Sequence, residues 1–158
     1  MVILVVEDRK DDVVLIRDAF RKAAVKNPLF IVRDGAEAQA YLEGTGKYRQ
    51  RAEFPLPNLV LLDLKMPKMD GFELLEWIRN HSAFKALRIV VLTSSQDIYD
   101  VSKAYELGAN SFLVKPHDFM NFTAMMRTLG SFWVRHSFAP CLERPPQDEP
   151  TKKAGGDD

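Results

Sequence analysis

The sequence predicts an α/β fold in which helices cover both faces of one parallel, five-stranded sheet. Five short apolar runs bounded by Asp, Gly or Pro alternate with segments of helical periodicity. The chain has 158 residues, 46% of them hydrophobic, which is enough to bury one substantial core but too short for two ordinary domains. We therefore expect one domain over residues 1–138 and a Pro-rich, charged tail over 139–158, with no output domain.

The five apolar runs are the predicted strands. Their length of four or five residues is short for buried helices. Near-continuous Val, Ile and Leu in the first, third and fourth runs is typical of central strands that are buried on both faces. The runs are Val2–Val6, Leu29–Val32, Leu59–Leu62, Ile89–Leu92 and Ser111–Val114.

The segment after the first run predicts an amphipathic helix. Its core face is formed by Val13, Ile16, Phe20 and Ala23, which fall on one arc at about 100° per residue, whereas Val14 points away. A second helix is expected from about residue 35 to residue 43. The following stretch, residues 44–57, contains two Gly and two Pro and predicts a long polar loop. Loops of this length are often functional.

Three further helices are expected. One follows Gly71, and the next runs from about Asp97 to Leu107 and stops at Gly108, a good helix terminator. The last runs from about residue 118 to residue 136. Its apolar face is wider than one sheet contact needs, which predicts contact with a second chain. That face consists of Phe122, Met125, Met126, Leu129, Phe132 and Trp133.

Charge and cysteine content exclude several classes of function. The 22 basic and 22 acidic side chains cancel, and no basic block exceeds a pair, so nucleic-acid binding is not expected. Cys141 is the single cysteine and cannot form an intrachain disulfide. The sequence lacks a signal-peptide pattern and an apolar stretch of the roughly 20 residues that cross a bilayer. A cytoplasmic protein without membrane contact is expected.

Polar side chains follow four of the predicted strands. Glu7 and Asp8 follow the first strand, Asp63 the third, Thr93 the fourth and Lys115 the fifth. Ligands of parallel α/β sheets bind beyond the carboxyl ends of the strands. We therefore expect three carboxylates, a hydroxyl and an ammonium to converge in one crevice.

These groups suit phosphoryl transfer. Carboxylates held close together repel one another unless a divalent cation offsets their charge, and Mg²⁺ prefers such oxygen ligands. A carboxylate can attack phosphorus while a cation and an ammonium neutralise charge on the phosphoryl oxygens. These are the predicted roles of Asp63 and Lys115. Thr93 is expected to donate a hydrogen bond to the phosphoryl group and to move inward only when it is present, as a switch.

Through these motifs the chain resembles the response regulator receiver family over about residues 2–136. The motifs are Val5–Asp8, Leu61–Gly71, Leu92–Ser95 and Leu113–Pro116. The resemblance implies a flavodoxin-like fold with strand order 2-1-3-4-5. It also implies a phosphoacceptor signalling protein that assists its own phosphorylation and dephosphorylation, and is not otherwise an enzyme.

The resemblance further implies roles for individual residues. Mg²⁺ would be bound by Glu7, Asp8 and Asp63 with the backbone carbonyl of Lys65. Lys65 and Ser95 would modulate the access of hydrolytic water. Phe112 stands where the family places its switch aromatic, often Tyr, and Lys115 would precede Pro116 through a cis peptide bond.

The long loop, the absence of an output domain and the broad last helix resemble single-domain regulators that partner bacterial phytochrome kinases. The expected partner is then a sensor histidine kinase, docked over the crevice and over Val14 and Leu15. A homodimer is expected through the helix over 97–107, the strand over 111–114, the helix over 118–136 and the arm that follows.

Three other functions remain open. An aspartyl phosphatase of the haloacid dehalogenase type would need a general acid where Lys65 stands. A flavin carrier would need a phosphate-binding loop where residues 7–11 are largely acidic. A degenerate receiver that only binds proteins would not need Asp63, Thr93 and Lys115. Asp70-Gly71 is interpreted as a turn signal and nothing more.

Overall fold

The structure is a computed structural model, and it describes residues 1–136. The expected tail over 139–158, with Cys141, lies outside the described residues. Within residues 1–136, no helix is both long and apolar enough to cross a membrane.

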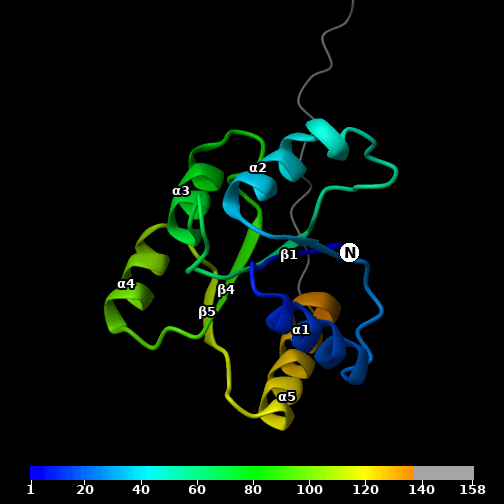
Figure 1. Cartoon of the computed structure of the whole chain (residues 1–158), viewed down its shortest axis with the longest axis vertical. Coiled ribbons are helices and arrows are strands. Elements are labelled where there is room, and N and C mark those ends of the chain that lie inside the picture. Colours follow the sequence, from blue (N-terminus) through cyan, green and yellow to red (C-terminus); the bar gives the residue numbers. More distant parts are fainter. Residues whose placement is uncertain (137–158) are drawn as a thin grey trace, which may run out of the picture.

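Five parallel strands form one sheet in the order β2-β1-β3-β4-β5, which confirms the expected topology (Figure 1). Val6 at the end of β1 is in register with Val32 of β2 and Leu62 of β3. The inner strands β1 and β3 are buried along their whole length, as their apolar composition predicts. The strands are β1 (Ile3–Val6), β2 (Leu29–Val32), β3 (Leu59–Leu62), β4 (Arg88–Thr93) and β5 (Ser111–Val114).

Helices cover both faces of this sheet (Figure 1). One face packs against α1 and α5, and the other packs against α2, α3 and α4. The α-helices are α1 (Lys10–Lys22), α2 (Gly35–Glu43), α3 (Gly71–Asn80), α4 (Ile98–Glu106) and α5 (Phe119–Leu129). A π-helical segment, η2 (Gly130–His136), continues α5, and a 3-10 turn, η1 (Gly46–Tyr48), follows α2.

Local signals explain where the helices begin and end. The Asp34 side chain caps α2 by accepting a hydrogen bond of 2.8 Å from the Glu37 N–H, and Gly44 ends α2 in the left-handed conformation. Helix α1 buries Ile16 and Phe20 as predicted. The expected core residue Val13 is only half-buried: it lies in the first turn of α1, and the buried residues of this helix begin at Ile16.

The polar loop expected over residues 44–57 is partly a packed segment. The ring centroids of Tyr48 and Phe54 lie 5.0 Å apart, and Tyr48 lies 5.0 Å from Tyr41 of α2. The Arg51 guanidinium donates hydrogen bonds to the carbonyls of Tyr41 (2.7 Å) and Leu42 at the end of α2. The interpretation as a polar loop was therefore wrong, because its aromatic side chains bury apolar area and its arginine satisfies helix carbonyls.

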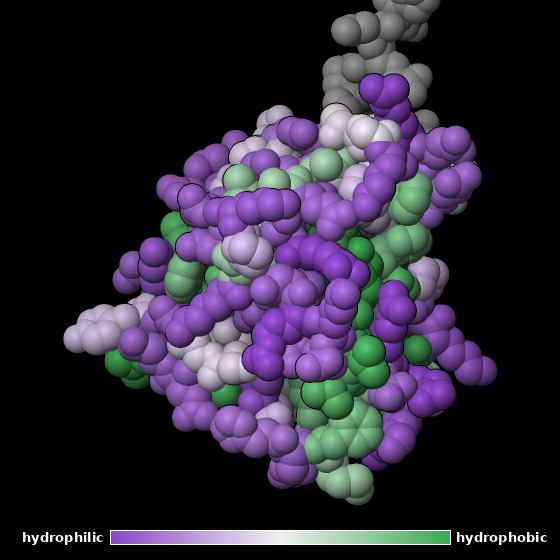
Figure 2. All heavy atoms as spheres, in the orientation of Figure 1, coloured by the Kyte–Doolittle hydropathy of each residue, from purple (hydrophilic) through white to green (hydrophobic). Residues whose placement is uncertain are grey.

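The last helix uses most of its apolar face inside the protein. Three of its six apolar residues are buried against α1 and the sheet, and Met125 and Trp133 are half-buried in the same cluster. Only Phe132 of the six is exposed. Packing against α1 as well as the sheet accounts for most of the width of this face, and contact with a second chain stays a prediction. Apolar side chains that remain at the surface include Val14 and Leu15 of α1 and Met120 of α5, and Figure 2 shows hydrophobic residues gathered over these two helices.

Candidate functional site

Three carboxylates meet at the carboxyl ends of β1 and β3. One oxygen each from Glu7, Asp8 and Asp63 lies within 4.8 Å of the others. Because β1 and β3 are adjacent and in register, the residues that follow Val6 and Leu62 are brought side by side. The sequence predicted this convergence correctly.

The cluster has the properties of a site for a hard divalent cation. Asp8 has a buried carboxylate oxygen, Oδ1, with no hydrogen-bond partner in the described part of the chain. A buried carboxylate oxygen without a partner is costly, and a cation would satisfy it. All the side-chain donors are carboxylate oxygens, which Mg²⁺, Mn²⁺ and Ca²⁺ accept. These residues therefore fit a divalent metal ion.

The electrostatics of the carboxylate cluster also favour a cation here. Burial raises the pKa of Asp63 despite the opposing effects of Lys115 and of hydrogen bonds from the Thr93 side chain and the Leu64 N–H. Burial likewise raises the pKa of Glu7, although Lys115 partly offsets it. The fold therefore disfavours the charged carboxylates until further positive charge arrives.

Lys115, directly after β5, places an ammonium group beside the carboxylates. Its ammonium contacts Glu7, lies 2.8 Å from Asp12 Oδ2 and lies 4.0 Å from Asp63 Oδ2. Burial alone would lower the pKa of Lys115, but the carboxylates of Asp63, Asp12 and Glu7 outweigh it and the pKa is raised. Lys115 therefore stays protonated. Asp12 was not predicted from the sequence, although its position in the first turn of the helix that follows Glu7 and Asp8 could have indicated it.

The described residues contain no cis peptide bond, so the Lys115–Pro116 bond is trans. The expectation of a cis bond was therefore wrong. Trans is the lower-energy isomer even before proline, by about 0.5–1 kcal/mol. With a trans bond the lysine still reaches Glu7 and Asp12, so this contact does not require the cis isomer.

The fourth strand places Thr93 beside Asp63, as predicted. The Thr93 side chain is buried, and its hydroxyl oxygen accepts a hydrogen bond of 3.3 Å from the Ser95 N–H. The Ser95 hydroxyl donates to the Asp100 carboxylate in the first turn of α4. Thr93 and Ser95 therefore connect the site to α4.

Phe112 is half-buried on β5 and packs against the core on the side of α2, α3 and α4. Its backbone N–H donates a hydrogen bond of 3.1 Å to the hydroxyl of Tyr105. Tyr105 was not predicted, and its hydroxyl covers the outer edge of the sheet beside the predicted switch residue.

A small pocket opens onto Asp63 and Thr93. Lys65, which follows the β3 end and is exposed, lines it, as does Arg9 from the turn before α1. Arg9 was also missed, although it directly follows the acidic pair. The lining of this pocket therefore combines the basic side chains of Arg9 and Lys65 with the acidic side chains of Asp12 and Asp63.

Gly71 lets α3 begin directly against the backbone that follows β3. A Cβ at this position would lie 2.3 Å from the carbonyl oxygen of Asp63 and 2.8 Å from Cα of Leu64. Asp70 caps α3 in a reciprocal capping box with Glu73. The interpretation of Asp70-Gly71 as only a turn signal was therefore wrong, because these residues start the helix and permit its close approach.

Replacing Asp8 with Ala is expected to weaken the binding of a divalent cation, titrated as Mg²⁺, about tenfold, because the cluster loses one ligand and one charge. Titration calorimetry of the full chain measures this. Asp11→Ala is the matched control, since it removes an exposed acid from the first turn of α1 outside the cluster. Equal Mg²⁺ affinity of the parent and Asp8→Ala would show that this cluster is not the metal site.

Comparisons with known proteins agree with this geometry. A family model described as the response regulator receiver domain matches residues 3–127. Response regulator Rcp1 of Synechocystis sp. is 39% identical over 133 residues, which cover 84% of this chain and 88% of Rcp1. A crystal structure of the Mn²⁺-bound form of Rcp1 aligns with a TM-score of 0.80 and 38% identity, covering 89% of this chain and 99% of that one.

Two other solved structures are similar over most of the chain. The phosphorylated cyanobacterial phytochrome response regulator RcpA is 34% identical with a TM-score of 0.81, covering 88% of this chain and 97% of RcpA. The bacteriophytochrome response regulator RtBRR is 42% identical with a TM-score of 0.70, covering 92% of this chain and 86% of RtBRR.

Proposed function

This chain belongs to the response regulator receiver family, and from that premise we propose that it accepts a phosphoryl group on Asp63, with Mg²⁺, from a histidine kinase of the bacterial phytochrome type. One observation carries the proposal. The Asp63 carboxylate lies in a cluster with Glu7 and Asp8, and the Lys115 ammonium is 4.0 Å away. The similarity to RcpA and RtBRR supports the choice of kinase.

The side chains of the site have complementary roles in the transfer. An oxygen of Asp63 forms a bond to phosphorus while the bond from phosphorus to the donor breaks and its electron pair leaves with the donor. Lys115 neutralises charge on one phosphoryl oxygen, and the Thr93 hydroxyl donates a hydrogen bond to another. Burial of these groups strengthens both interactions. Bound Mg²⁺, held by Glu7, Asp8, Asp63 and the Lys65 carbonyl, would supply further positive charge for the phosphoryl oxygens.

Intact mass measurement after incubation with Mg²⁺ and a small phosphodonor tests the proposal. The mass of one phosphoryl group should be gained, and a chelator should prevent the gain. A phosphatase would instead release phosphate continuously, whereas a flavin carrier or a degenerate receiver would gain no mass. Absence of the gain at saturating donor would contradict the proposal.

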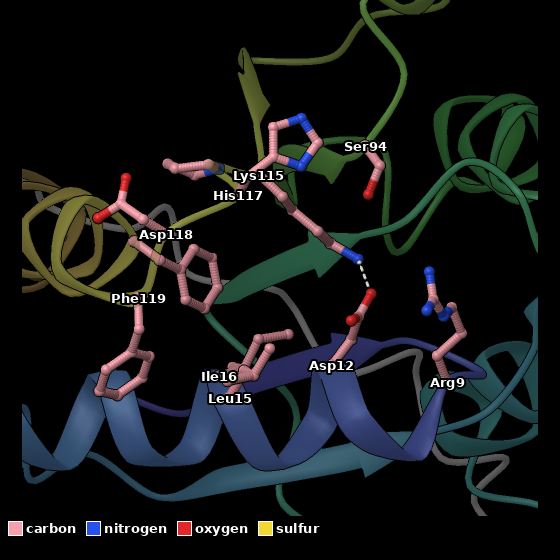
Figure 3. Close-up of a pocket in the computed structure, with 11 residues that line it drawn as sticks. Arg9, Asp12, Leu15, Ile16, Ser94, Lys115, His117, Asp118 and Phe119 are labelled. Carbon is pink, nitrogen blue, oxygen red and sulfur yellow. Dashed lines mark hydrogen bonds and ion pairs between the residues drawn. The ribbon is translucent and has the colours of Figure 1, made fainter.

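The exposed side of α1 is the proposed kinase docking surface. Val14 and Leu15 are exposed there, beside a pocket lined by Leu15, Phe119 and Lys115 (Figure 3). Phe122 also lines this pocket. A kinase bound over this pocket would present its phosphohistidine to Asp63.

Replacing Val14 with Lys is expected to slow phosphoryl transfer from the kinase about tenfold, because the charged side chain would be buried where an apolar contact was made. Phosphoryl transfer from a small phosphodonor should be unchanged. Phosphorylation time courses with each donor measure this. Ile98→Lys on α4 is the matched control, since Ile98 is 71% exposed and Val14 is 57% exposed. Equal slowing with both donors would indicate damage to the fold.

Self-association is proposed through the surface of α4, β5 and α5. Ile98, Tyr99, Met120 and Phe132 are exposed on these helices and on η2, and such side chains are typical of interfaces. Coupling to the site would run through Thr93 and Phe112, because a hydroxyl drawn toward the phosphoryl group leaves space for the ring. Trp133 is a poor probe of this surface because it is half-buried.

Ile98→Lys is expected to weaken the dimer about tenfold, because an apolar interface side chain is replaced by a charge. Sedimentation with and without a phosphoryl mimic measures the dimer affinity and its dependence on phosphorylation. Val14→Lys serves as the control and should not change the affinity. A parent that stays monomeric at high micromolar concentration in both states would end the interface proposal.

A further inference from the structure

We propose that Asp12 is a positioning residue that holds the Lys115 ammonium in a resting place and competes with the phosphoryl group for it. This inference rests on the proposed role of Asp63 as phosphoacceptor. Its basis is the pair of distances from Lys115 Nζ, which are 2.8 Å to Asp12 Oδ2 and 4.0 Å to Asp63 Oδ2. The ammonium therefore sits closer to α1 than to the acceptor.

The ion pair between Asp12 and Lys115 is shielded from water. The Lys115 side chain is 10% exposed and the Asp12 side chain is 14% exposed. Ion pairs at such sites are screened less than surface pairs, so each charge affects the position of the other. Figure 3 shows Asp12 rising from the first turn of α1 with its carboxylate directed at the lysine ammonium.

A general helix-terminus effect does not explain this contact. Asp11 and Asp12 both lie in the first turn of α1, where negative charge interacts favourably with the helix dipole. Asp11 is exposed, whereas Asp12 contacts Lys115 across the entrance of the site. The specific role therefore belongs to Asp12 alone, and Asp11 provides an internal comparison.

Asp12 also differs from the other carboxylates around Lys115. Glu7 and Asp63 belong to the cluster that would face the metal ion, whereas Asp12 lies outside it. When the metal and the phosphoryl group occupy the site, Asp12 is the carboxylate that continues to attract the ammonium away from the acceptor. Neutralising Asp12 should therefore release Lys115 toward the phosphoryl oxygens.

Asp12→Asn is expected to bind beryllofluoride, a phosphoryl mimic, about fivefold more tightly in the presence of Mg²⁺, and to be phosphorylated about fivefold faster by a small phosphodonor. A charge-assisted hydrogen bond is about twice as strong as a neutral one, and a difference of about 1 kcal/mol corresponds to this factor. Binding is measured by fluorine NMR and phosphorylation by intact mass. Asp12→Ala also removes the hydrogen-bond acceptor, so its effect should be at least as large.

Two controls separate this role from a structural one. Asp11→Asn should match the parent in both measurements. In a Lys115→Ala background, Asp12→Asn should have no effect on mimic affinity, because the competition requires the ammonium. A merely structural role of Asp12 would act with or without the lysine.

The inference is overturned if Asp12→Asn and Asp12→Ala match Asp11→Asn, if they bind the mimic more weakly, or if their effect persists without Lys115. Failure of the proposed function would look different. In that case the parent itself would gain no phosphoryl group at Asp63, whatever stands at position 12.

Discussion

Replacing Asp63 with Asn is expected to abolish phosphorylation by the kinase and by small phosphodonors, while the protein still folds. The amide keeps the volume of the side chain but lacks the nucleophilic carboxylate oxygen and part of the charge that binds the metal. Intact mass measurement and Mg²⁺ titration test both losses. Phosphate retained at another residue at the parent's rate would contradict the assignment.

The same substitution is expected to stabilise the metal-free protein at neutral pH. Burial raises the pKa of the Asp63 carboxyl above its ordinary value. The free energy of unfolding of the parent therefore falls as pH rises through the folded-state pKa, because the buried carboxylate becomes charged. Asp63→Asn escapes this loss, and its advantage should shrink as pH falls through the folded-state pKa of Asp63 and be gone below the pKa of the unfolded chain. Thermal unfolding at several pH values measures the difference. Added Mg²⁺ should reduce the advantage, because it binds the folded parent more tightly.

Gly71→Ala is expected to destabilise the protein by about 3 kcal/mol and to slow phosphorylation by about 100-fold. The added methyl group would lie 2.3 Å from the carbonyl oxygen of Asp63, so α3 and the end of β3 must separate. That movement would displace the acceptor carboxylate from Lys115 and from the other acids. Denaturant unfolding and phosphorylation time courses with a small donor measure the two effects.

Gly46→Ala is the matched control for this prediction. Gly46 has a φ of +56° and a Cβ at this position would meet no atom within 4 Å, so the substitution should cost about 1 kcal/mol from backbone strain alone. Phosphorylation should be unchanged. If Gly71→Ala behaves like Gly46→Ala, the contact between α3 and the acceptor strand is not important for the site.

The sequence alone determined the order of the elements and most of the site, because the relevant signals are local. Continuous apolar runs identify buried strands, and Asp34 and Gly44 delimit α2 at the predicted residues. In a parallel sheet, residues that follow neighbouring strands must meet at one edge. For that reason the meeting of Glu7, Asp8 and Asp63 could be predicted from their positions in the chain.

Only the tertiary structure determined the contacts between elements that are distant in the chain. The partner of Asp12 is 103 residues away, and the need for glycine at position 71 arises from the backbone of Asp63. The width of an apolar face likewise does not reveal that α1 covers most of α5. Periodicity defines which side of a helix is apolar, but the packing distance and the neighbouring helix determine which side chains remain exposed and which charges meet.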